Sequence, residues 1–181
     1  MVRVICALLI ALLAHSAYAD GIDDLTNFMM TSFTNFFDEP SLHNVITAMD
    51  SISCQPETTV QSLIDNLMNV IVDNVNPSLV PEAYTAYSSL QDGINGQGGW
   101  DGFAANVASV ISQWCTPILQ ACQAQCANGP GACSAAAMQY ANIDFIKQVV
   151  DDLRSKIGED QFSTLKNDLG PCCLEFSNWG Y

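Results

Sequence analysis

Residues 115–133 read CTPILQACQAQCANGPGAC and hold four of the eight cysteines of the chain. Cys115, Cys122 and Cys126 are spaced by seven and four residues, so on one helix they project from the same side. Neighbours along a straight helix rarely offer the Cβ directions that a disulfide needs, so we expect partners from elsewhere in the fold. The turn sequence NGPG then folds Cys133 back toward Cys126 or Cys122. The segment therefore predicts a helix that disulfides tie to its neighbours.

The first 19 residues have the features of a secretory signal peptide. Arg3 precedes an apolar run over residues 4–13, and Ala17 and Ala19 supply the small residues of a cleavage site. The run is shorter than the about 20 apolar residues that a membrane-spanning helix needs, and no later segment is long and uncharged enough. We predict a signal peptide over residues 1–19 and a secreted, extracellular protein without a membrane span.

The mature chain keeps seven cysteines, an odd number. In an exported protein we interpret them first as a disulfide framework. The adjacent Cys172 and Cys173 are expected to reach two different partners, one on the three-cysteine helix and one at Cys54. Three internal bridges would leave one thiol free or paired with another chain, so a homodimer through an unpaired cysteine is one hypothesis. The sequence does not decide the connectivity among Cys54, Cys115, Cys122, Cys126, Cys133, Cys172 and Cys173.

Apolar residues recur at helical spacing along nearly the whole mature chain. The widest apolar face lies on residues 60–75, which we expect to form a central helix. Residues 133–157 are expected to form one long helix, and the aromatic tail over residues 172–181 to pack back on the domain. No segment alternates with period two for long enough to predict a strand. The fold class is therefore all-α, a single compact domain over residues 20–181 with six or seven disulfide-stapled helices.

Prolines and glycines predict several helix boundaries. We expect Pro40 to end the first helix and Ser41 to cap the second. Pro56 is expected to open the third helix, Gly93 to end the fourth, and Pro117 to bend or break the fifth.

Charge is distributed unevenly. Residues 20–146 contain 13 acids and neither lysine nor arginine, and the four cations of the mature chain follow: Lys147, Arg154, Lys156 and Lys166. Four cations against 19 acids give a mature formal charge of −15. Nucleic acids and anionic membranes bind basic patches, so this composition argues against both as partners. Trypsin would find no site in residues 20–146, so residence in a protease-rich fluid is a further hypothesis.

Motifs for catalysis or metal binding are not apparent. His43 is the one histidine of the mature chain, and none of the cysteines has the sequence signature of a nucleophile that such a base would activate. Export favours disulfides over a zinc site, and no acidic stretch has the ligand spacing of a calcium loop. We therefore predict no enzyme, no catalytic residues, no metal and no cofactor.

Two non-enzymatic functions remain open, and an enzyme whose catalytic residues are scattered along the sequence is a third class, ranked last. Hydrophobic residues make up 49% of the chain, more than a narrow core stripe on each helix needs. We predict a non-enzymatic binding or carrier protein for a small apolar ligand, with a cavity of roughly 300 Å³ or more lined by Phe, Met, Leu and Val, whose ligand-binding residues are unknown. The alternative is a structural, self-assembling extracellular protein that associates when acid neutralises its carboxylates.

Overall fold

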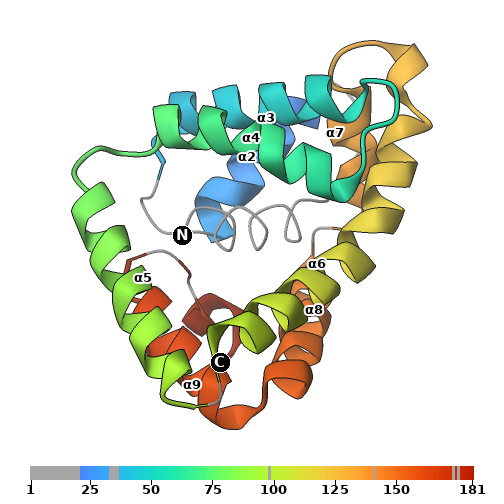
Figure 1. The fold of residues 1–181 in the computed structure, drawn as a ribbon. Helices are drawn as coiled ribbons and strands as arrows, with labels where there is room; N and C mark the ends of the chain where they lie inside the picture. Colours follow the sequence, from blue (N-terminus) through green and yellow to red (C-terminus); the bar gives the residue numbers. More distant parts are fainter. Residues whose placement is uncertain (1–20, 33–36, 98, 141, 173, 175) are drawn as a thin grey trace.

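A computed structural model describes residues 21–32, 37–97, 99–140, 142–172, 174 and 176–181 (Figure 1). The predicted signal peptide lies outside these residues. All regular structure in the described part is helical, which confirms the all-α prediction. The α-helices are α2 (Gly21–Ser32), α3 (Glu39–Ser53), α4 (Val60–Asn74), α5 (Val80–Asn95), α6 (Trp100–Gln123), α7 (Ala132–Ala137), α8 (Ile143–Ile157) and α9 (Glu159–Leu169). None of these helices is long and apolar enough to cross a membrane.

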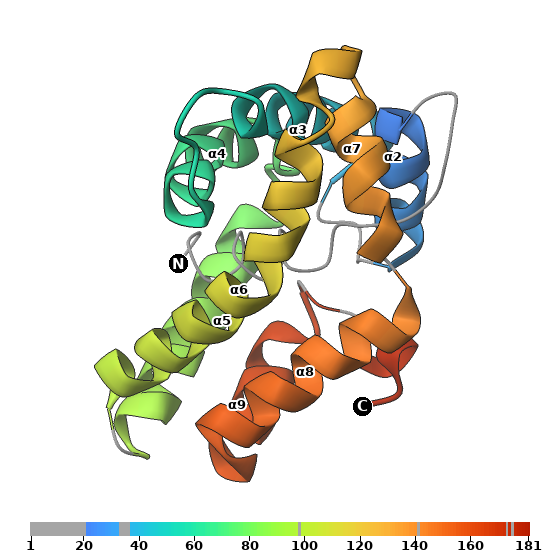
Figure 2. The ribbon, with the colours of Figure 1, turned by 90° about the vertical axis from the view of Figure 1, so that its right-hand side faces the viewer.

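Helix α6 connects two groups of helices (Figures 1 and 2). At one end it lies beside α7, near α2, α3 and α4, and at the other it runs beside α5 and α8, which both pack on α9. One continuous cluster of buried apolar side chains runs through both groups, from Leu25 and Leu67 to Phe103, Leu165 and Trp179. The prediction that residues 60–75 form the central helix is therefore wrong. Those residues do form a buried apolar face, but Val72 is 52% exposed on the opposite side of α4.

Capping side chains set two boundaries that the prolines did not. Asp38 caps α3, because its carboxylate accepts a hydrogen bond of 2.8 Å from the backbone N–H of Ser41. Pro40 lies in the first turn of this helix, where a missing N–H costs nothing, so the expectation that it ends a helix is wrong. Helix α4 begins at Val60 rather than Pro56, because Thr59 forms a capping box with Ser62.

Three other boundaries differ from the sequence analysis. Helix α5 continues through Gly93 to Asn95, and α6 continues through Pro117. Burial of the neighbouring Ile118 and Leu119 compensates for the backbone hydrogen bond that a proline removes. Residues 133–157 are divided between α7 and α8, since Asn142 accepts a hydrogen bond of 2.7 Å from the N–H of Phe145 and starts a new helix. That division takes the α-helices of the described part to eight, one above the expected range.

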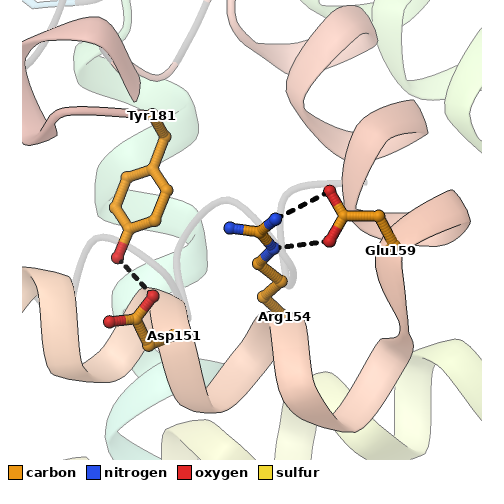
Figure 3. Close-up of polar contacts among 4 residues, drawn as sticks. All are labelled: Asp151, Arg154, Glu159 and Tyr181. Carbon is orange, nitrogen blue, oxygen red and sulfur yellow. Dashed lines mark hydrogen bonds and ion pairs between the residues drawn. The ribbon is translucent and has the colours of Figure 1, made fainter.

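The C-terminal tail packs back on α8 and α9, as expected. Phe176 and Trp179 are buried, and the Tyr181 hydroxyl lies 2.8 Å from an Asp151 carboxylate oxygen (Figure 3). Burial, followed by that hydrogen bond, raises the pKa of Tyr181 to about 12. Beside it, the Arg154 guanidinium donates two hydrogen bonds, of 2.6 and 2.9 Å, to Glu159 at the start of α9. Contacts between α8, α9 and the tail thus hold together the C-terminal part of the chain, where the lysines and arginines of the predicted mature chain lie.

Candidate functional site

The disulfides tie α6 and the turn after it to two neighbouring helices. Cys54, at the end of α3, pairs with Cys126, with Cα atoms 5.5 Å apart. Cys122 on α6 pairs with Cys133 on α7, with Cα atoms 4.1 Å apart, so the turn does fold Cys133 back onto α6. The expectation that Cys54 pairs with a cysteine near the C-terminus is wrong. The reason is that the loop after α3 lies against the end of α6, where Gln123 Nε2 donates a 2.8 Å hydrogen bond to the Thr58 carbonyl.

Cys172 does not pair with Cys122 on α6 or with Cys126 in the turn after it, whose partners are the ones above. Cys126 lies beyond the end of α6, so the three cysteines predicted on one helix are not all on it. Cys172 is itself disulfide-bonded. Cys173 lies outside the described residues.

Cys115 is the cysteine without a disulfide among the described residues. It is 2% exposed, and burial raises the pKa of its thiol to about 12. Near neutral pH the thiol is therefore protonated and a poor nucleophile. A bridge from Cys115 to another chain would require α6 to separate from its neighbours, so this residue gives little support to covalent dimerisation.

Asp50 is a buried carboxylate that the sequence analysis did not single out. It is 5% exposed and accepts hydrogen bonds from the N–H groups of Gly131 and Ser134, at 3.0 and 2.7 Å. The Ser134 hydroxyl adds a third bond of 2.8 Å. These donors lie at the start of α7, so Asp50 fastens that helix to α3 in a structural role. The sequence does carry a signal for this role, because Asp50 is an acid four residues after Ile46, on the apolar face of a helix.

The mature chain's histidine, His43, contacts a carboxylate rather than a thiol. His43 Nδ1 lies 3.0 Å from Asp23 Oδ1, so the pair links α3 to α2 with both side chains about half exposed. Within the described ranges, no three His, Cys, Asp or Glu side chains gather closely enough to hold a metal ion.

The enclosed space beside Cys115 is too small for an organic ligand. It has a volume of about 20 Å³ and is lined by apolar side chains that include Met49, Leu63 and Leu119. That is room for about one water molecule beside Ser53, which also lines the space. This cavity is a packing defect and does not match the predicted carrier cavity.

The better candidate is an open groove between α5 and α9, with a volume of about 470 Å³. Its apolar lining comes from Pro81 and Ala86 on α5 and from Pro171 and Cys172 after α9. Its polar lining comes from Glu82, Thr85, Ser89, Asn167 and Asp168. The volume lies within the range of small-molecule sites, whereas the lining differs from the Phe, Met, Leu and Val that we expected.

The groove results from how two antiparallel helices meet (Figure 1). Near the end of α5 they approach closely, because Gly93 has no Cβ, and a Cβ there would lie 2.8 Å from Thr164 Cγ2. One turn earlier on α5, Ser89 donates a 2.9 Å hydrogen bond to Asp168. Helix α9 ends at Leu169, so the first turns of α5 extend beyond it. The groove lies between the first turns of α5, the last turn of α9 and the residues that follow it.

Two exposed apolar side chains lie on the first turns of α5, outside the groove lining. Val80 is 41% and Tyr84 is 64% exposed. Neither lines the groove, whose α5 residues are Pro81, Glu82, Thr85, Ala86 and Ser89, and on the helix Val80 projects away from that side.

Comparison with known proteins adds no relative. No protein-family model, no curated protein and no solved structure matches this chain.

Proposed function

We propose that this protein is a secreted, non-enzymatic binding protein that holds a small apolar ligand in the groove between α5 and α9. The observation that carries the proposal is the groove itself, about 470 Å³ in volume, with apolar side chains in its lining. Export is supported by the disulfides, which persist in oxidising compartments.

Pre-organisation favours binding at this place. Both walls are regular helices, and the contacts at Gly93 and Ser89 hold them at a fixed separation. A ligand therefore meets a groove whose shape does not have to be formed on binding, which reduces the entropic cost. A site at the surface also lets the ligand exchange without opening the core.

A variant that fills the groove tests this proposal. Asn167, on α9, is exposed and lines the groove, so Asn167→Trp should occupy the space of the ligand. Ser163→Trp is the matched control, because Ser163 is exposed on the same helix and does not line the groove. The probe is octyl glucoside below its critical micelle concentration, titrated while amide NMR shifts are recorded.

We expect the wild type and Ser163→Trp to show saturable shifts confined to residues 80–89 and 167–172, and Asn167→Trp to lose them. Circular dichroism establishes that each variant keeps its helices. Shifts spread over the whole chain, or equal binding by Asn167→Trp and the wild type, would refute the proposed site.

A further inference from the structure

We infer that the ligand of the α5–α9 groove is an organic cation, an apolar body that carries an ammonium group. The inference rests on the proposed function and specifies its ligand class. Two carboxylates, those of Glu82 and Asp168, border the groove, and its lining includes no lysine, arginine or histidine.

The two carboxylates are placed on opposite walls. Glu82 lies in the first turn of α5 and Asp168 in the last turn of α9. Asp168 Oδ1 accepts the hydrogen bond from Ser89, which holds the side chain in place and leaves Oδ2 available. Within the described part of the chain, neither carboxylate forms an ion pair. A bound ammonium would supply the countercharge that both lack.

The apolar surface between the carboxylates matches the rest of such a ligand. Pro81 and Ala86 on α5, with Pro171 and Cys172 beyond α9, supply apolar lining for the body of the ligand. Anionic apolar ligands would meet two like charges on a molecule of formal charge −15, so repulsion excludes them. The groove thus selects by charge as well as by apolar contact.

Three probes with the same octyl chain test the inference: octyltrimethylammonium, octyl glucoside and octyl sulfate, each below its critical micelle concentration. Isothermal titration of the full mature chain at low salt should rank them cation, neutral, anion in affinity. Glu82→Gln and Asp168→Asn should each weaken the cation by roughly twofold to fivefold, the range for exposed ion pairs, and leave the neutral probe unchanged. The amide oxygen that Asp168→Asn introduces can still accept the hydrogen bond from Ser89, so the groove keeps its shape.

Asp92→Asn is the matched control for the overall charge. Asp92 is exposed on α5, does not line the groove, and its loss changes the net charge by the same one unit. Equal weakening of the cation by Asp92→Asn and Asp168→Asn would show attraction by the whole molecule and overturn the inference. Equal affinity for the cation and the neutral probe would also overturn it, while the proposed function would stand. Absence of binding by all three probes would overturn both.

Discussion

Individual residues decide where helices approach each other most closely. Gly21, at the start of α2, faces the start of α7, and a Cβ there would lie 2.5 Å from the Ala135 nitrogen and 2.6 Å from the Gly131 carbonyl oxygen. Both are backbone atoms, which cannot turn away as a side chain could. The helix pair can pack at this distance because the residue at position 21 has no side chain.

Gly21→Ala should therefore lower the free energy of unfolding by about 1–3 kcal/mol, the usual cost of overpacking. The control is Gly102→Ala, inside α6, where a Cβ would meet nothing within 4 Å. This second variant should raise stability by about 0.5–1 kcal/mol, because alanine favours a helix over glycine. Urea denaturation followed by circular dichroism measures both. Changes of the same sign would contradict the described contact.

Cys115 makes the free energy of unfolding depend on pH in the alkaline range. Burial raises the pKa of its thiol from 9.0 to about 12, so between these values an unfolded chain loses the proton while the folded chain keeps it. The stability that the buried, protonated Cys115 thiol contributes is therefore fully present below pH 9 and is lost as the pH rises toward 12. At about pH 10.5 the loss amounts to about 2 kcal/mol relative to neutral pH.

The measurement compares urea denaturation of the wild type and Cys115→Ala at about pH 8 and about pH 10.5. The wild type should lose about 2 kcal/mol more than the variant over this interval, since other alkaline effects, including those at Tyr181, are common to both chains. Identical losses would mean that the thiol titrates normally in the folded protein.

At the scale of elements, a buried carboxylate holds the start of α7. It has six residues, too few to be stable alone, and Asp50 accepts three hydrogen bonds at its start. Asp50→Asn would replace one acceptor oxygen with an amide NH₂ group that faces the N–H and O–H donors of Gly131 and Ser134. It would also weaken the remaining hydrogen bonds, because an amide oxygen is a poorer acceptor than a carboxylate oxygen. We expect a loss of about 2–3 kcal/mol in the free energy of unfolding, the cost of disrupting hydrogen bonds to a buried charged group.

Asp73→Asn serves as the reference for this measurement, because Asp73 is exposed on α4. Its effect should stay within about 0.5 kcal/mol. If chemical denaturation gave the same midpoint for both variants, Asp50 would not be what fastens α7 to α3.

The elements also show what a sequence can and cannot predict here. Apolar spacing predicted the helices themselves, since each needs a buried face. The predicted helix boundaries were wrong where a side-chain cap, such as Asp38 or Asn142, determines the start of the helix. In a sequence, a capping residue is a weaker signal than a proline. The groove could not be predicted, because it follows from where α9 ends against α5. That contact joins Ser89 to Asp168, which are 79 residues apart in sequence.

For the whole molecule, the positions of the cations give a test of export. Trypsin acting on the reduced, unfolded protein secreted by a eukaryotic host should leave one large fragment that ends at Lys147. Its mass should correspond to residues 20–147 if the signal peptide has been removed. A fragment beginning at residue 4, after Arg3, would show that the signal peptide remains and would refute the predicted cleavage.

The same distribution of lysines and arginines makes one end of the molecule more negative than the other. All four lysines and arginines of the predicted mature chain lie on α8 and α9, whereas α2 to α7 carry neither residue type. The protein is therefore an electric dipole as well as a polyanion. In the field of a charged surface it experiences a torque, so it would approach a cationic surface with the α2–α4 end foremost and turn α8 away. The torque biases its orientation before any contact forms, over a range of about one Debye length, roughly 10 Å at 0.1 M salt.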